Sequence, residues 1–413
     1  MKTYRNLFDR FASFDNLALA YRAARRGKRQ SADVARFELE WESEILAIRC
    51  DLLGDRYQFG RYRRFTVREP KERLISAAPF RDRVVHHALV NVLEPIYESR
   101  FIHDTYACRE DRGTHRAVLR CQEHARRYRY VLKADVSKFY QTVDHEMLLG
   151  ILRRQVRDKR ILSLLKAVLA GYDTGSEYYH AFQGDDLFSP FRARGIPIGN
   201  LTSQFFANIY LGHIDSIIKR EMHVQGYVRY MDDMLLFSDD REQLRAWRSA
   251  LRAGLADLRL LLHPEKCGII NAKNGIPFLG FRVFPQHRLL LGAGVRRFVR
   301  RTRKQIKAVE RGNLEYAALN RSIRGWISHA EFGDSYILRR TILSRLVTRG
   351  QGGRAEPAEP GVAGRLVEQR YNEPPLRRSQ QQRPDESQQQ HRVPVREDDY
   401  CLSPARCGGP GRA

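Results

Sequence analysis

The sequence predicts an α+β protein in which short strands alternate with amphipathic helices. Apolar residues recur at helical spacing in several long stretches, which is typical of helices packed on a core. Two short β-type segments, 227–229 and 234–237, flank a tight polar turn and predict a hairpin. A further apolar segment, 130–134, is followed by an aspartate and predicts a strand that runs into a turn.

The remaining elements follow the same periodicities. Before the hairpin, the pattern predicts helices over 1–60, basic strands over 61–83, helices over 84–98, 113–127 and 145–170, and an irregular polar stretch over 171–194. Pro95 is expected to stop its helix, and Thr202 or Ser203 to cap the helix that the loop 195–204 opens. After the hairpin, it predicts a helix over 240–258, a strand over 266–271, a turn and strand over 275–281, and basic helices over 293–346.

Three aspartates are the candidate chemical groups. Asp232 and Asp233 lie at the hairpin turn, where paired carboxylates beside buried strands are costly unless they are neutralised. A solvated Asp-Asp turn is the common alternative for this motif alone, and a lone strand-end aspartate such as Asp135 is often a helix cap. Together, however, the three match the arrangement used for two-metal phosphoryl transfer. We expect Asp135, Asp232 and Asp233 to be catalytic and to bind two Mg²⁺ ions, with Mn²⁺ a possible substitute.

The composition points to a polyanionic partner. The net charge is +25 and the isoelectric point is near 10.1, and such an excess of like charge favours binding to nucleic acid. A membrane surface is the alternative, but no long apolar span is present. Six cysteines form no CxxC pair, so neither a zinc site nor a disulfide framework is indicated. The first residues lack an apolar signal segment, and a cytoplasmic location is expected.

The order of these motifs resembles that of the reverse transcriptases over residues 60–345. The resemblance implies an RNA-directed DNA polymerase that acts on template RNA, a cDNA/RNA heteroduplex and dNTPs. It also implies a right-hand polymerase fold, with fingers, a palm of antiparallel sheet plus helices, and a helical thumb. The implied domains are an N-terminal helical extension (1–60), fingers and palm (61–292), a basic helical thumb (293–348) and a disordered tail rich in Gln, Arg and Pro (349–413).

The resemblance also assigns roles to residues. Asp135 and Asp232 would bind both metals with help from the Val136 carbonyl, and Asp233 would complete the acidic cluster. Tyr140 would be the aromatic gate against a nucleotide 2′-hydroxyl, although its spacing also suits a core aromatic. The residues expected to contact the nucleotide are Arg68, Lys71, Arg73, Tyr140, Ile198, Gln204 and Lys266. Alternatively, Arg68, Lys71 and Lys266 are simply solvated surface charges. Phe278, Leu279 and Gly280 resemble the primer grip.

Two motifs narrow the resemblance to the diversity-generating retroelement reverse transcriptases. Most reverse transcriptases carry Gln-Gly and Ser-Pro where this chain has Ile198-Gly199 and Ser203-Gln204. The segment Trp326-Ile327-Ser328-His329, and the lack of an appended endonuclease or RNase H domain, agree with that class. An apolar residue at 198 would remove a polar contact to the nascent pair and so lower fidelity.

That class implies mutagenic retrohoming. A template-repeat RNA would be copied with adenine-directed errors to diversify a target gene, in a bacterial or phage setting and with a small basic pentameric accessory protein. Group II intron-like, retron and phage-defence reverse transcriptases are alternatives, as is a non-catalytic nucleic-acid-binding protein with a palm fold. The Gln-rich blocks 380–382 and 388–390 suggest that the end of the gene overlaps its template repeat; a plain low-complexity linker is the alternative.

Overall fold

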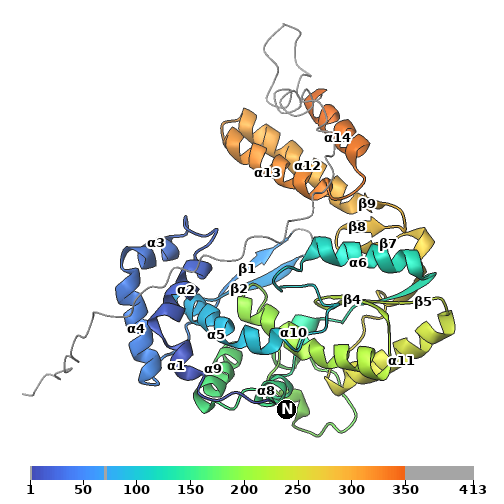
Figure 1. Cartoon of the computed structure of the whole chain (residues 1–413). Coiled ribbons are helices and arrows are strands. Elements are labelled where there is room, and N and C mark those ends of the chain that lie inside the picture. The colour runs from blue at the N-terminus through green and yellow to red at the C-terminus, as the bar shows by residue number, and fades with distance from the viewer. Residues whose placement is uncertain (1, 69–71, 349–413) are drawn as a thin grey trace, which may run out of the picture.

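The computed structural model describes residues 2–68 and 72–348 and confirms a mixed helix and sheet fold (Figure 1). The predicted tail and Lys71 lie outside the described residues. No helix within the described part is long and apolar enough to cross a membrane. The division into fingers, palm and thumb stays a prediction.

A four-stranded antiparallel sheet forms the centre of the molecule. Its order is β4 (Gly226–Tyr230), β5 (Asp233–Ser238), β3 (Tyr130–Ala134) and β6 (Gly268–Asn271). The predicted hairpin is confirmed as β4–β5, with Tyr230 paired to Asp233. In the neighbouring pair, Ala134 lies opposite Met234. Because of this register, Asp135 and the hairpin turn reach the same end of the sheet.

The two faces of the sheet bury alternate residues in different cores, as the two-residue period of a strand requires. Leu132 and Leu236 face one core, which includes α5 (Phe80–Glu98) and α10 (Leu201–Ser216). Val131 and Leu235 face a second core, which includes α6 (Thr114–Arg127). The sheet is therefore covered on both sides (Figure 1).

The N-terminal region adds helices and a ribbon to the first core. The helices are α1 (Phe8–Phe11), α2 (Phe14–Ala24), α3 (Ala32–Leu39) and α4 (Trp41–Leu53). α1, α2 and α3 pack against α5, and α4 packs against α2 and α3, with Tyr21 stacked on Trp41 at 5.6 Å between ring centroids. The antiparallel ribbon is formed by β1 (Arg63–Val67) and β2 (Arg73–Ala77).

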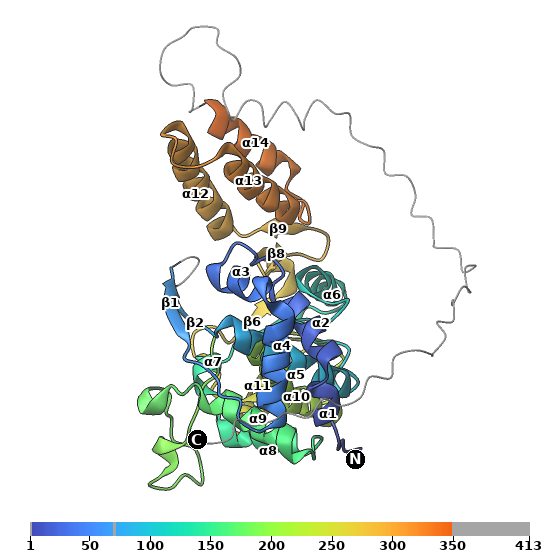
Figure 2. The ribbon, with the colours of Figure 1, turned by 90° about the vertical axis from the view of Figure 1, so that its left-hand side faces the viewer.

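The C-terminal region is a small sheet followed by a helical bundle. The sheet contains β7 (Ile276–Phe278), β8 (Phe281–Val283) and β9 (Arg288–Leu290), and the bundle contains α12 (Gly292–Glu310), α13 (Tyr316–Ala330) and α14 (Tyr336–Thr348). The bundle stands beyond the small sheet, away from the N-terminal helices (Figures 1 and 2). Phe298 stacks on Trp326 at 3.8 Å inside its own core, so this region packs around a separate centre.

Two helix boundaries differ from the prediction. Pro95 does not stop α5, which continues to Glu98, because Ile96 and Tyr97 are buried in the core and their packing outweighs the lost hydrogen bond. The predicted helix over 145–170 is two helices, α8 (His145–Arg153) and α9 (Lys159–Ala170). Asp158 caps the second of these by accepting from Arg160 N and Ile161 N.

The predicted caps of α10 are wrong. Thr202 and Ser203 are buried inside the helix, and Asn200 is its N-cap. The Asn200 side chain does not cap the helix. It donates to Ser76 O at 3.0 Å and accepts from Ala78 N at 3.3 Å, and so ties the start of α10 to β2. A tertiary hydrogen bond has replaced the local cap.

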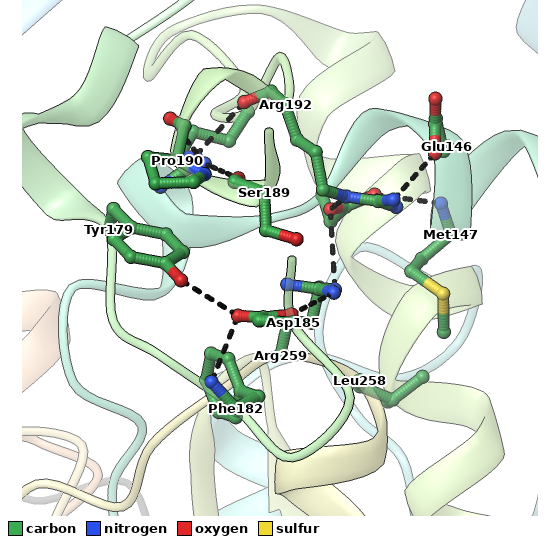
Figure 3. Close-up of polar contacts among 12 residues, drawn as sticks. Glu146, Met147, Tyr179, Phe182, Asp185, Ser189, Pro190, Arg192, Leu258 and Arg259 are labelled. Atoms are coloured by element: carbon green, nitrogen blue, oxygen red, sulfur yellow. Dashed lines mark hydrogen bonds and ion pairs between the residues drawn. The ribbon is translucent and has the colours of Figure 1, made fainter. Parts of the chain in front are cut away.

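The polar stretch 171–194 is irregular, as predicted, but it is braced by ion pairs (Figure 3). Only short 3₁₀ turns occur in it, η1 (Gly175–Tyr178) and η2 (Ser189–Phe191). Asp185 pairs with Arg259 and accepts a hydrogen bond from Tyr179 Oη at 3.0 Å. Arg192 binds both Asp144 oxygens at 2.7 and 3.0 Å. Charged contacts thus hold this segment in place where apolar burial is sparse. In the described part of the chain, the remaining elements are the short α7 (Phe139–Thr142), η3 (Ile217–Glu221) and η4 (Ala272–Asn274), and the long helix α11 (Arg241–Asp257).

Candidate active site

The three predicted aspartates lie at the same end of the central sheet. Asp135 directly follows β3, Asp233 begins β5, and Asp232 lies in the two-residue turn between β4 and β5. Met231 in that turn has a left-handed φ of 54°, a conformation that is uncommon for a residue other than glycine. The tight turn places Asp232 and Asp233 beside the Asp135 strand.

The carboxylates repel one another. Burial, and then the charge of Asp135, raise the pKa of Asp232 to about 6. Burial also raises the pKa of Asp233, although Lys133 opposes the shift from 3.4 Å. Lys266 forms an ion pair with Asp135. Two lysines therefore offset part of the negative charge at this end of the sheet.

The donor set suits a divalent cation chemically. Carboxylate oxygens are the ligands that Mg²⁺ prefers, and a cation between them would relieve the repulsion that raises the pKa of Asp232. Within residues 2–68 and 72–348, however, no three His, Cys, Asp or Glu side chains converge in the arrangement of a metal site. Lys266 would have to release Asp135 before that carboxylate could bind a metal. The backbone of Val136 forms an antiparallel bridge with Leu262, and its predicted part in metal binding stays a prediction.

Tyr140 lies beside Asp232 and packs against the core of the protein. It is mostly buried in α7, and burial, followed by the charge of Asp232, raises the pKa of its hydroxyl above the usual range. Its carbonyl accepts a hydrogen bond from Ile196 N at 2.7 Å, which draws the 195–200 loop against it. Ile198 O accepts from Ser76 N at 3.0 Å, so that loop also joins β2. Tyr140, Ile198 and the ribbon strand that begins at Arg73 are thus brought together.

The other predicted nucleotide-binding residues are less closely assembled. Gln204 is partly exposed in α10 and accepts a hydrogen bond from Cys108 Sγ at 3.2 Å. Lys266 lies against the aspartates through its pair with Asp135. Arg68 is exposed after β1, and the structure gives it no contact with the aspartates; Lys71 is outside the described residues.

The predicted primer-grip residues form a second tight hairpin. Phe278 pairs with Phe281, and Leu279 and Gly280 between them have left-handed φ values of 47° and 90°. Positive φ at both central residues is the requirement of the turn that suits twisted antiparallel strands. Phe278 is buried, which anchors the turn, while Gly280 is exposed.

A buried ion pair behind the β4–β5 hairpin was not among the sequence predictions. Arg229 in β4 is 0% exposed and binds Asp215 of α10 at 2.6 and 2.8 Å. It also donates to Met231 O at 3.2 Å, inside the turn that carries the aspartates. The signal was present, because an arginine in a buried strand requires a buried acid, but its partner was not identifiable from spacing.

The comparison with known families decides the identity. Residues 68–283, more than half of the chain, match the sequence model of the reverse transcriptase (RNA-dependent DNA polymerase) family. The chain belongs to the reverse transcriptase family. It is an RNA-directed DNA polymerase, for which a nucleic-acid template and dNTPs are the substrates.

Individual relatives agree with this assignment. Protein YkfC of Escherichia coli is 28% identical over 287 residues, covering 58% of this chain and 71% of YkfC. Nuclear intron maturase 2 of Arabidopsis thaliana is 30% identical over 41% of this chain and 25% of its own length. The group II intron-encoded protein LtrA of Lactococcus lactis is 26% identical over 149 residues, which cover 36% of this chain and 23% of LtrA. This reverse transcriptase therefore spans most of YkfC but only about a quarter of the other two.

Proposed function

We propose that this reverse transcriptase is of the diversity-generating retroelement class and copies a template-repeat RNA with adenine-directed errors. The observation that carries the proposal is the placement of Ile198, an apolar residue, in the loop that packs against Tyr140 and β2. The class implies mutagenic retrohoming, a bacterial or phage origin with a cytoplasmic location, and a small basic pentameric accessory protein as partner. The proposed arrangement is fingers and palm over 61–292 and thumb over 293–348, next to the helical extension 1–60.

The proposed chemistry is attack of a primer 3′-hydroxyl on the α-phosphate of a dNTP, with pyrophosphate leaving. Asp135, Asp232 and Asp233, with the Val136 carbonyl, would hold two Mg²⁺ ions, which when bound activate the hydroxyl and stabilise the leaving group. Arg73, with Arg68 and Lys71, would bind the triphosphate by charge. Lys266 would protonate the leaving pyrophosphate once it has released Asp135.

Sequencing of the cDNA tests the class. The purified enzyme, supplied with template-repeat RNA and the accessory protein, should misincorporate opposite adenines far more often than opposite the other template bases. Accurate copying of adenines under those conditions would favour the alternative, a group II intron-like reverse transcriptase, to which the maturase and LtrA matches give support.

Replacement of Ile198 by Gln should improve fidelity. A glutamine would restore a polar contact to the nascent pair. A hydrogen bond contributes a net of roughly 0.5–1.5 kcal/mol, so adenine errors should fall by roughly 2- to 10-fold. The measurement is error frequency per template base. I337Q, at an exposed position on α14, is the matched control. Unchanged errors in I198Q would show that this position does not set fidelity.

Replacement of Tyr140 by Val should relax the choice of sugar. Tyr140 is partly buried and lies next to Asp232, so removing its ring opens space for a 2′-hydroxyl. Steric discrimination by one side chain is worth roughly 10–200-fold. We therefore expect the ratio of kcat/KM for rNTP to kcat/KM for dNTP to increase by a factor of roughly 10–200. Single-nucleotide incorporation assays measure the ratio, and Y140F should retain the wild-type value. A Y140V enzyme that still rejects rNTPs would disprove the gate.

A further inference from the structure

Three large apolar side chains are exposed together on the irregular segment between α9 and α10. Leu187, Phe188 and Phe191 are 82%, 73% and 80% exposed, and they lie in or directly beside η2. A single exposed apolar residue is ordinary, but several on one short turn are typical of an interaction surface. These three side chains are called the apolar patch below.

The backbone that carries the apolar patch is held by its own hydrogen bonds. Asp186 Oδ1 accepts from Phe188 N at 3.1 Å and from Ser189 Oγ at 2.7 Å. Arg194 donates to Ser189 O and to Pro190 O, both at 3.0 Å. Ser189 and Pro190 belong to the polar network drawn in Figure 3. A surface that is already ordered loses little entropy when a partner covers it, so the apolar patch is suited to recognition.

The surroundings of the apolar patch are acidic, although the whole chain has a net charge of +25. Segment 171–194 contains four acidic residues and two arginines, a net charge of −2. Both arginines are engaged within the molecule, since Arg192 pairs with Asp144 and Glu146 and Arg194 bonds to the backbone of η2. A partner that fits this surface therefore has an apolar depression bordered by cations.

Such a depression exists in the same molecule, between α12 and α14. Its volume is about 880 Å³, in the range of pockets that take up large apolar groups. Its apolar lining reaches the core of the bundle, where Ile342 and Leu346 are buried. Six of its lining residues are arginine or lysine, among them Arg303 and Lys307, whereas Glu310 is the one acid among them. This depression is called the bundle groove below.

The apolar patch lies far from the bundle groove of its own chain. Segment 171–194 is tied to the start of α8 by the pair between Arg192 and Asp144, at the end of the molecule opposite to α12 and α14 in both views (Figures 1 and 2). A contact between the two surfaces therefore joins two copies of the chain, head to tail. The positive net charge does not prevent it, because charges separated by more than about 8 Å are largely screened at physiological ionic strength.

We propose that the protein self-associates by inserting the apolar patch of one copy into the bundle groove of the next. The acidic segment then lies against the cations of the groove, and the aromatic side chains cover apolar lining that is otherwise in contact with water. Because the two surfaces differ, the assembly extends beyond a dimer unless it closes into a ring. A nucleic-acid duplex fits the groove less well, since it would neutralise the cations but bring no apolar side chain to the lining.

Two complementing variants test the proposal. F188S/F191S removes the aromatic part of the apolar patch, and R303E/K307E reverses two charges of the bundle groove at exposed positions. Sedimentation velocity of the full chain, freed of nucleic acid, measures the self-association constant. Each double variant alone should associate about 10-fold or more weakly than wild type, the loss expected when central aromatic or charged contacts are removed.

The mixture of the two variants gives the sharper result. F188S/F191S keeps its groove and R303E/K307E keeps its patch, so an equimolar mixture can form one intact contact. The mixture should therefore recover dimers but no longer species. A loss of folding in either variant could not produce this recovery, and circular dichroism checks folding independently.

Matched controls separate a specific contact from a general change in surface character. L39S removes an exposed apolar side chain at the end of α3, and R321E/R324E reverses two exposed charges on α13 outside the bundle groove. Both controls should associate as strongly as wild type.

Several results would overturn the proposal. Wild-type protein that stays monomeric at all concentrations would do so, as would a patch variant that associates like wild type. A mixture no more associated than its two components would show that patch and groove do not meet, as when two patches pair with one another. Weaker duplex binding by R303E/K307E, with wild type monomeric, would assign the groove to nucleic acid. The polymerase and class proposals are independent of these results, because cDNA sequencing and primer extension test them separately.

Discussion

Replacing Asp232 with Asn should abolish DNA synthesis, with a loss on the order of 10³-fold or more in primer extension. The carboxylate lies beside Asp135 with a pKa raised to about 6, and removing its charge leaves a bound metal without a ligand. Metal stabilisation of the transition state is worth several kcal/mol, and each 1.36 kcal/mol is tenfold in rate. The rate is measured by single-turnover primer extension.

The control for this prediction is D257N, a carboxylate change at an exposed position of α11. It should retain wild-type extension. Binding of the primer–template duplex should persist in D232N, because removal of a negative charge does not weaken attraction to a polyanion. Extension by D232N at a wild-type rate would remove Asp232 from the proposed chemistry.

Replacing Arg229 with Met should destabilise the protein by about 3–5 kcal/mol, since it leaves Asp215 as an uncompensated buried charge. Arg229 and Asp215 are 0% and 2% exposed, and Tyr227 Oη donates a further hydrogen bond to Asp215 at 2.9 Å. The loss should also loosen the turn between β4 and β5, because the hydrogen bond from Arg229 to Met231 O disappears. Urea unfolding measures the free-energy change.

A paired variant distinguishes the buried charge from a loss of packing. R229M/D215L removes both charges and should recover much of the stability, because an apolar pair of similar volume often replaces a buried ion pair at little cost. R245M on the exposed face of α11 should cost less than about 1 kcal/mol, as is usual for surface ion pairs. If R229M had the same free energy of unfolding as R245M, the buried ion pair would not contribute to the stability of the protein.

Secondary structure was predicted correctly wherever the pattern of apolar residues along a short segment was the dominant influence. The alternation around 227–237 predicted β4–β5, and the apolar spacing over 113–127 predicted α6. The errors arose where distant residues compete with local rules. Asn200 forms bonds with β2 that no neighbour in sequence predicts, and α5 passes through Pro95 because Tyr97 is buried.

The sequence by itself determined the kind of enzyme. Asp135, Asp232 and Asp233 are tied to strand ends by short-range pattern, and the match of residues 68–283 to the reverse transcriptase family is also a property of the sequence. Only the tertiary structure decided the lysines that offset their charge, the Arg229 ion pair behind the turn, and the bundle groove that includes Arg303 and Lys307. The reason is physical. Strand pattern depends on neighbours in the chain, whereas an ion pair or a pocket depends on strand register and helix packing that join residues far apart in sequence.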